Sequence, residues 1–164
     1  MKEEEKGAGT GHEEFRVRDY AKDDYADVAG LWQLTGLSNQ SRGDTEAVIN
    51  ETLVSGGKLL ILEELMLGKI CGTCWMTCDG RRIHLHHFGI HPDYQGRKLS
   101  WLLLKESFRF IKQKGYQVKL EVNRNNIKAI NLYKKAGFNY LGDYDVYIIR
   151  DLSVIDNNDN MDMK

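Results

Sequence analysis

The most constraining feature of the sequence is a strand–helix–strand pattern in the middle of the chain. A strand is predicted over Arg82–His91, since the Asp79-Gly80 hairpin turn signal precedes it and Pro92 ends it. Apolar residues at helical spacing then run through Arg97–Lys114, up to Gly115. Every second residue of Tyr116–Val122 is again apolar. This order predicts a parallel βαβ unit with a right-handed crossover, and therefore a sheet with helices packed on it.

Periodicity on either side of this unit predicts the remaining elements. Together they predict an α/β (mixed α+β) fold, with a mixed central sheet of about six to seven strands flanked by about four helices. Asp44 is expected to cap the second helix, which should bury Ala47, Val48, Leu53 and Val54. The expected elements are a strand near Phe15, a helix from Asp23 or Asp24 to about Leu34, a helix from Asp44 to Gly56, strands over Lys58–Glu63 and Lys69–Cys78, a helix from Asn125 or Asn126 to Gly137, and a last strand from Phe138 to about Arg150.

Composition is that of a single globular domain. The chain has 164 residues, of which 41% are hydrophobic and 29% charged, enough to build one core and too apolar for wholesale disorder. No apolar run approaches the ~20 residues of a membrane helix, and the N-terminus lacks the apolar stretch of a secretory signal. We expect a disordered charged tail over residues 1–14, one domain over 15–150 and an acidic flexible tail over 151–164.

The net charge of −1 at pH 7 is unevenly distributed. Both tails are acidic, so residues 15–150 carry a net positive charge. A mildly basic body favours an anionic ligand, but the excess is too small for a nucleic-acid-binding protein, and neither nucleic acid nor a membrane is an expected partner. Three cysteines do not form a disulfide framework, so we expect a reducing, cytoplasmic location.

The spacing of the cysteines in the sequence is that of a zinc site, but the expected strand geometry does not suit one. Cys71 and Cys74 lie two residues apart, with Cys78 and several histidines nearby. Within a strand, however, Cys71 and Cys74 face opposite sides, and no turn brings them onto one ion. We therefore expect buried thiols that pack as small apolar groups, and no metal site.

Two cations stand at the start of the helix expected over Arg97–Lys114. Arg97 and Lys98 oppose the helix dipole there, at a typical cost of about 0.3–1 kcal/mol each. Either an anion binds the free N–H groups and the basic side chains clamp it, or the cations simply point into water. The position after the carboxyl end of a strand in a parallel βαβ unit favours a ligand site.

These residues carry a resemblance to a known family. The segment from His91 to Ser100, HPDYQGRKLS, resembles the pyrophosphate-binding segment of the GNAT superfamily of acyl-CoA-dependent N-acetyltransferases. The resemblance covers most of residues 15–150 and implies a GNAT-like fold with an N-acetyltransferase domain there. A second family signature is similar to Leu120-Glu121-Val122 followed by Asn126, Ala129, Leu132-Tyr133 and Gly137-Phe138.

The pyrophosphate-binding segment departs from the family pattern, Gln/Arg-x-x-Gly-x-Gly/Ala, at two positions. Gln95 matches, whereas Lys98 and Ser100 replace the two small residues. Glycine there permits a positive φ and a close approach of phosphate to the backbone. We expect cofactor binding to survive, because Ser100 is small and the Lys98 ammonium group can itself contact the pyrophosphate. The opposite outcome, a loop that excludes the pyrophosphate, stays open.

The resemblance also implies roles for individual residues. Acetyl-CoA, the acetyl donor, would lie against the carboxyl ends of two strands, and backbone groups of Phe88 and Ile90 would hold the pantetheine and polarise the thioester carbonyl. Asn126 would hydrogen-bond the cofactor arm. Tyr133 would act as general acid, because a phenol of pKa ~10 stays protonated at neutral pH. The residues implied to bind the cofactor are Phe88, Ile90, Gln95, Gly96, Arg97, Lys98, Leu99, Ser100, Asn126 and Tyr133.

An attacking amine must lose a proton, so the site needs a base or a water relay. A lysine-like amine is neutral in roughly one molecule of a few thousand at pH 7, and an α-amino group in about one of ten. The candidate bases are Glu121 and a histidine, His86 or His87, of which we select His86 and Glu121. Strand alternation places His84 and His86 on one face and His87 on the other.

The predicted function is transfer of an acetyl group from acetyl-CoA to a primary amine by direct attack in a ternary complex. The acceptor, a small molecule or a peptide, is not specified; Trp32, Leu37 and the connection Ser38–Gly43 fall where GNAT enzymes build the acceptor pocket. Two alternatives remain: a ribosomal-protein-type N-terminal acetyltransferase, and a CoA-binding regulatory or degenerate GNAT module without turnover. The protein is expected to be a monomer or a homodimer.

Overall fold

The computed structural model describes residues 14–38 and 43–156. Residues 1–13 and 157–164, which make up most of the two expected tails, lie outside the described residues, as does part of the Ser38–Gly43 connection. The helices and strands are β1 Phe15–Asp19, η1 Lys22–Asp24, α1 Tyr25–Thr35, α2 Glu46–Val54, β2 Lys58–Glu64, β3 Lys69–Cys78, β4 Arg82–Ile90, η3 Pro92–Tyr94, α3 Leu99–Lys114, β5 Gln117–Leu120, α4 Ile127–Lys135 and α5 Ser153–Asp156.

The chain forms two compact units, which are described separately. The first runs to Glu121 and contains every strand of the described residues, and the second begins at Val122 and contains α4 and α5. In the second unit, the Asn126 side chain caps α4 by accepting a hydrogen bond from the Ala129 amide. Gly137, at a φ of +96°, follows the end of this helix.

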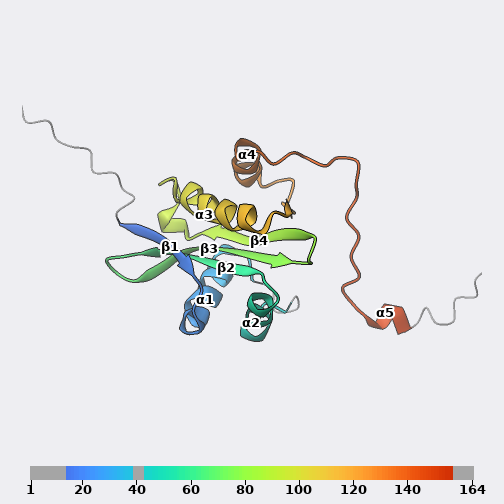
Figure 1. Cartoon of the computed structure of the whole chain (residues 1–164), viewed down its shortest axis with the longest axis horizontal. Helices are drawn as coiled ribbons and strands as arrows, with labels where there is room; N and C mark the ends of the chain where they lie inside the picture. The colour runs from blue at the N-terminus through green and yellow to red at the C-terminus, as the bar shows by residue number, and fades with distance from the viewer. Residues whose placement is uncertain (1–13, 39–42, 157–164) are drawn as a thin grey trace, which may run out of the picture. The chain divides into compact units, whose positions relative to one another are not determined.

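The first unit is built on a five-stranded sheet in the order β1-β2-β3-β4-β5. Neighbouring strands are antiparallel except β4 and β5, which are parallel and joined through α3. Figure 1 shows α1 and α2 on one face of this sheet and α3 on the other. The predicted βαβ unit and the mixed α/β fold are therefore confirmed.

The sheet has fewer strands than expected. Residues 138–152 form neither helix nor strand, although the alternating pattern predicts a strand from Phe138 to Arg150. Tyr140 and Tyr144, which the pattern assigns to one face, are 86% and 72% exposed. Alternation alone does not make a strand, because the backbone N–H and C=O groups must also pair with a neighbouring strand.

The second helix also differs from the prediction. Thr45, not Asp44, caps α2, and its hydroxyl accepts a hydrogen bond from the Val48 amide. The helix buries Ile49 and Thr52, while Val54 is exposed. The buried face of the helix therefore consists of other residues than the predicted face. Because Thr45 caps the helix, the Asp44 side chain is available for a contact elsewhere in the protein.

The core on the α1 side of the sheet centres on two tryptophans. Trp32 of α1 stacks on Trp75 of β3, with ring centroids 5.4 Å apart and planes inclined by 9°. The Trp32 indole N–H donates to the Thr73 hydroxyl at 2.8 Å, and this hydroxyl donates to the His87 carbonyl at 2.9 Å. Trp32 and Thr73 are almost fully buried, so this pair of hydrogen bonds joins α1, β3 and β4 inside the core.

The carbonyl of His87 lies in a β-bulge of β4. Thr73 pairs with Gly89 and Trp75 pairs with His86, so two residues of β4 lie opposite the single residue between Thr73 and Trp75. His87 has a φ of +48°, in the left-handed region that residues other than glycine seldom adopt. The bulge therefore changes the direction of β4 close to its carboxyl end.

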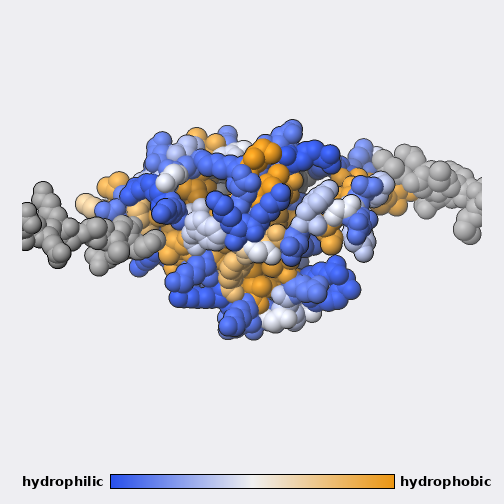
Figure 2. Space-filling view, turned by 90° about the horizontal axis from the view of Figure 1, so that it is seen from above, coloured by the Kyte–Doolittle hydropathy of each residue, from blue (hydrophilic) through white to orange (hydrophobic). Residues whose placement is uncertain are grey.

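The surface is mostly polar. Hydrophilic side chains cover much of the face drawn in Figure 2, with hydrophobic residues showing between them. None of the helices in the described part of the chain is long and apolar enough to cross a membrane.

We predict that Thr73→Val destabilises the protein. The substitution leaves the Trp32 N–H and the His87 carbonyl without their buried partner, at a cost of roughly 1–3 kcal/mol of unfolding free energy. Urea denaturation followed by tryptophan fluorescence measures this change. Thr77→Val on the same strand is the control, because Thr77 is less buried, and its effect should stay within about 0.5 kcal/mol. Equal effects of the two substitutions would contradict a special role for the Thr73 hydroxyl.

Candidate active site

The two parallel strands pair over only part of their length. Arg82–Leu85 of β4 pairs with Gln117–Leu120 of β5. β4 continues through the bulge to Ile90, whereas β5 ends at Leu120. Among the described residues of the first unit, none therefore forms a strand that pairs with the β5-side edge of His86–Ile90. This open edge, at the carboxyl ends of parallel strands, is where ligands bind in α/β sheets.

Three histidines of β4 gather on the α1 side of this edge. The rings of His84 and His86 lie 5.3 Å apart, and Nδ1 of His86 lies 3.0 Å from Nδ1 of His87. The His87 ring also contacts Trp32, with centroids 4.4 Å apart. The expectation that His87 faces the opposite side of the sheet is therefore wrong, because the bulge turns its side chain to the same side as His86.

Two of these histidines, His84 and His86, have a lowered pKa. Burial, together with the neighbouring His87 and His84, lowers the pKa of His86 to about 3, against the opposing effect of Asp44. Burial also lowers the pKa of His84. At neutral pH His86 therefore presents a lone pair instead of a charge, which is the form that accepts a proton.

Asp44 is the carboxylate of this cluster. Its Oδ2 lies 3.1 Å from Nε2 of His87, and the two side chains are only 6% and 9% exposed. Asp44 directly precedes the Thr45 cap of α2, so the start of this helix brings the carboxylate to the bulge. The sequence prediction missed this residue as a member of the site, because an aspartate before a helix is usually a cap.

The segment before α3 has two residues in the left-handed conformation. Gly96 has a φ of +80°, and no atom lies within 4 Å of the position that a Cβ would take. Lys98, which precedes the first residue of α3, has a φ of +61° and a ψ of 13°. The Leu99 side chain is buried and Ser100 is half-buried, so this segment offers backbone N–H groups and the exposed Lys98 to a ligand.

Gln95 and Arg97 brace this segment. The Gln95 amide donates to the Ile90 carbonyl at 3.0 Å, which ties the loop to the end of β4. The Arg97 guanidinium lies 3.1 Å from the Glu14 carboxylate and over the Phe15 ring, 4.7 Å from its centroid. It also lies 5.9 Å from the centroid of the Tyr94 ring. The contact of Arg97 with a phosphate stays a prediction.

The other predicted site residues lie at the end of the first unit and in the second. Glu121 follows β5 and is exposed, with its carboxylate 4.0 Å from the Lys119 ammonium group. Within the second unit, Asn126 caps α4, and Tyr133 is 8% exposed. The Tyr133 ring packs edge-on against Phe138, with centroids 5.6 Å apart.

The cysteines are packing residues of β3. The Cys71 thiol donates to the Leu62 carbonyl at 3.4 Å, and Cys74 interacts with Ser107 of α3 on the other face. Burial raises the pKa of both thiols to about 12. No cluster of three or more metal-ligating side chains occurs within residues 14–38 and 43–156.

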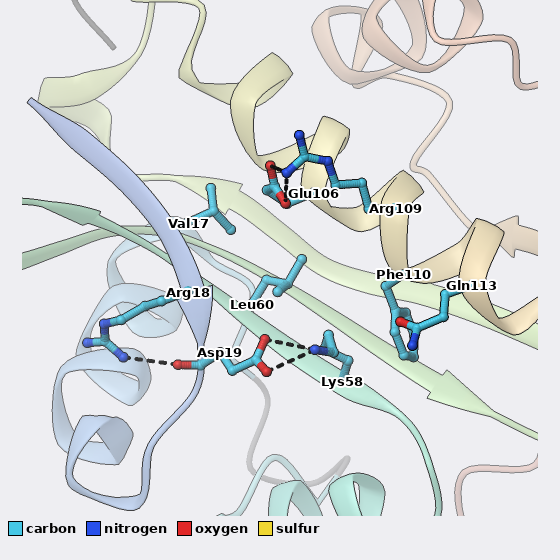
Figure 3. A pocket seen from close by; sticks show the side chains of 9 residues that line it. All are labelled: Val17, Arg18, Asp19, Lys58, Leu60, Glu106, Arg109, Phe110 and Gln113. Carbon is cyan, nitrogen blue, oxygen red and sulfur yellow. Dashed lines mark hydrogen bonds and ion pairs between the residues drawn. The ribbon is translucent and has the colours of Figure 1, made fainter. Parts of the chain in front are cut away.

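Two hollows of the first unit lie elsewhere. One, of about 180 Å³, lies between β1, β2 and α3. Figure 3 shows that its charged side chains turn toward one another, with Lys58 bonded to Asp19 and Arg109 to Glu106. The other, of about 230 Å³, lies along α1 and β3 and includes His91. Both are smaller than typical ligand pockets of about 300–1,000 Å³, so we place the site at the open β4 edge.

Comparisons with known proteins agree with this geometry. Residues 15–138 match the acetyltransferase (GNAT) family. An acetyltransferase of Sodalis glossinidius is 28% identical over 125 residues, which are 76% of this chain and 87% of the relative. The crystal structure of an acetyltransferase from Streptococcus agalactiae has a TM-score of 0.69 at 18% identity. The match covers 83% of this chain and 92% of the Streptococcus agalactiae chain. The crystal structure of the ribosomal-protein-S18-alanine N-acetyltransferase from Escherichia coli has a TM-score of 0.65 at 21% identity. The match covers 76% of this chain and 77% of the Escherichia coli chain.

The site and these matches define the protein as an acetyltransferase. The family match spans most of the chain, so the chain belongs to the GNAT family of acetyl-CoA-dependent N-acetyltransferases. The cofactor suits the residues present, because the open β4 edge, the uncrowded Gly96 and the start of α3 offer backbone groups to an extended, anionic ligand.

We predict that Lys98→Gly stabilises the protein. An L-residue in the left-handed region costs about 1–2 kcal/mol relative to glycine, so the free energy of unfolding should rise by roughly 1 kcal/mol in chemical denaturation. Lys105→Gly is the matched control: Lys105 is an exposed residue inside α3, and glycine there should cost about 1 kcal/mol. A loss of stability in both variants would contradict strain at Lys98.

Proposed function

We propose that the protein transfers the acetyl group of acetyl-CoA to a primary amine by direct attack in a ternary complex. The observation that carries this proposal is the neutral His86 beside the open edge of β4. In this reaction the amine nitrogen bonds to the acetyl carbon, the carbon–sulfur bond breaks, the nitrogen loses a proton and the sulfur gains one. The chain must therefore supply a proton acceptor and a proton donor.

We assign the proton acceptor to His86. Amine acceptors are largely protonated at pH 7, so a base close to the β4 edge increases the reactive fraction. His86 is neutral and only half-buried. Glu121 is the second candidate base, and its exposed carboxylate lies 4.0 Å from the Lys119 ammonium group.

Acetyl-CoA supplies an acyl group activated as a thioester. We propose that Gly96, Lys98 and the first N–H groups of α3, at Leu99 and Ser100, bind its pyrophosphate. Gln95 positions this loop through the Ile90 carbonyl, and Arg97 adds positive charge from its place beside Glu14. Backbone groups of Phe88 and Ile90 would align the pantetheine along β4, and Asn126 is proposed to hydrogen-bond it.

We assign the proton donor to Tyr133, on the resemblance of its segment to the second GNAT signature. Its phenol is protonated at neutral pH, and a departing thiolate has a conjugate acid of pKa ~8.5, so transfer of the phenolic proton is feasible. Tyr133 is largely buried against Phe138, which supports a fixed orientation.

We propose that the acceptor binds near Trp32 and Leu37, on the α1 side of the bulge. Leu37 lies close to Gly89 of β4, since its Cδ1 is 2.6 Å from the position that a Cβ on Gly89 would take. Small molecules and peptides are both possible acceptors under this proposal.

A narrower form of the proposed function is a ribosomal-protein-type N-terminal acetyltransferase, which is supported by the likeness to the Escherichia coli enzyme. We further propose a cytoplasmic monomer or homodimer.

A second candidate function is a CoA-binding regulatory module without turnover. Two observations favour it: Lys98 occupies a left-handed position in which the family pattern has glycine, and Arg97 is paired with Glu14. Both features would alter pyrophosphate binding. The neutral histidines at the β4 edge argue for turnover instead.

Thermal unfolding and thiol release distinguish these functions. We predict that acetyl-CoA raises the melting temperature, because a ligand that binds only the folded state stabilises it. We also predict release of the CoA thiol that depends on an added amine, measured with a thiol reagent across a panel of small amines and peptides. A thermal shift without thiol release would favour the regulatory module, and the absence of any shift would contradict acetyl-CoA binding.

We predict that Tyr133→Phe lowers kcat by roughly 10²–10⁴-fold and leaves the acetyl-CoA thermal shift intact, because it removes a proton donor and little packing. The control is Tyr140→Phe, since Tyr140 is 86% exposed in the same unit. Unchanged turnover of the Tyr133→Phe enzyme would remove Tyr133 from this role.

A further inference from the structure

Three side chains from two segments of the first unit lie in a row. Oδ2 of Asp44 is 3.1 Å from Nε2 of His87, and Nδ1 of His87 is 3.0 Å from Nδ1 of His86. The first two side chains are almost completely buried and the third is half-buried. The row therefore runs from a buried carboxylate to an imidazole that solvent or a ligand can reach.

The carboxylate determines where the protons of both neutral rings reside. The Asp44 carboxylate lies 3.1 Å from Nε2 of His87, and its negative charge attracts a proton to that nitrogen, so we assign the His87 proton to Nε2. Nδ1 of His87 then carries a lone pair. Because it lies 3.0 Å from Nδ1 of His86, the His86 proton belongs on Nδ1. Nε2 of His86 is left as a proton acceptor.

We propose that Asp44, His87 and His86 form a proton relay that deprotonates the amine acceptor and stores its proton on His87. This inference rests on the proposed function and extends it by two positioning residues, Asp44 and His87. In the relay, Nε2 of His86 takes a proton from the amine, and Nδ1 of His86 passes its own proton to Nδ1 of His87. The result is a neutral His86 and a His87 imidazolium whose charge Asp44 balances, so no proton is gained or lost overall.

The relay explains how a weak base can serve in this site. Burial and the neighbouring histidines hold the pKa of His86 at about 3, so a proton that stayed there would return to the amine. At His87, the next ring of the row, the Asp44 carboxylate lies 3.1 Å from Nε2 and would stabilise the imidazolium cation. Lys119 and Glu121 act on the neighbouring His84 with opposite signs, and the other rings against the row, Trp32 and Trp75, carry no charge.

The backbone supports the same conclusion. A positive φ at a residue other than glycine has a free-energy cost and persists only where its surroundings impose it. Here the Thr73 hydroxyl holds the His87 carbonyl, and the bulge turns the His87 ring toward His86 and Asp44. In a regular strand the ring would face α3 and the row would be broken.

Nitrogen-15 NMR of the wild-type protein at pH 7 tests the arrangement without relying on activity. We expect His86 to be protonated at Nδ1, the less common tautomer of histidine, and His87 at Nε2. In Asp44→Asn the tautomer preference of His87 should weaken. A His86 ring protonated at Nε2 in the wild type would overturn the relay, whatever the enzyme transfers.

The pH profile of kcat tests the use of the relay. For Asp44→Asn we expect kcat at pH 7 to fall roughly 10²-fold, with KM for acetyl-CoA unchanged. The deficit should shrink as the pH rises toward the acceptor's pKa, because solvent then deprotonates the amine. Glu51→Gln is the matched control, since Glu51 is an exposed carboxylate of α2, and it should leave the profile unchanged. His87→Gln provides a second variant with the same expectation as Asp44→Asn.

The outcomes separate this inference from the proposed function. A deficit in Asp44→Asn and His87→Gln that stays constant with pH would indicate a merely structural role and overturn the relay, while amine-dependent thiol release by the wild type would still support the proposed function. A wild type with the expected tautomers that acetylates no amine would contradict the proposed function and, with it, the use of the relay in catalysis.

Discussion

The hydrogen bond between the Thr73 hydroxyl and the His87 carbonyl is the constraint on which the site depends. It fixes a bulge in β4 from inside the core, and the Trp32 indole completes the arrangement from α1. Because Trp32 and Thr73 are almost fully buried, their polar groups would be costly to leave without a partner. The bulge therefore holds a residue with a φ of +48° in place and sets the direction of the end of β4.

The bulge and the partial pairing of the parallel strands create the chemistry together. Pairing with β5 stops at Leu85, and His86 and His87 follow immediately after that point. Burial keeps His86 neutral, while the carboxylate that compensates for a charge stands next to His87. A neutral imidazole, an open backbone edge and a left-handed loop with exposed basic side chains thus lie within one unit, and the proposed acetyl transfer would use all three.

The sequence predicts the elements whose signals are local. A period of 3.6 identifies α3 and a period of 2 identifies β5, while apolar stretches next to turn residues identify β2, β3 and β4. Asn126 and Gly137 mark the ends of α4. Three non-local features escape prediction. Inserting one residue at the bulge reverses the side assigned to His87, and Asp44 has a tertiary partner where a cap is expected. The alternating residues after Phe138 lack a pairing strand. The contacts of Arg97 are equally non-local, since Glu14 is distant in sequence.

The buried thiols of β3 have a consequence for an enzyme that handles a thioester. Acyl groups exchange readily from one sulfur to another, but only a thiolate attacks. Cys71 and Cys74 are fully buried, and a pKa of about 12 keeps both protonated at any physiological pH. Neither thiol can therefore take the acyl group from acetyl-CoA, and the protein avoids acylating its own central sheet.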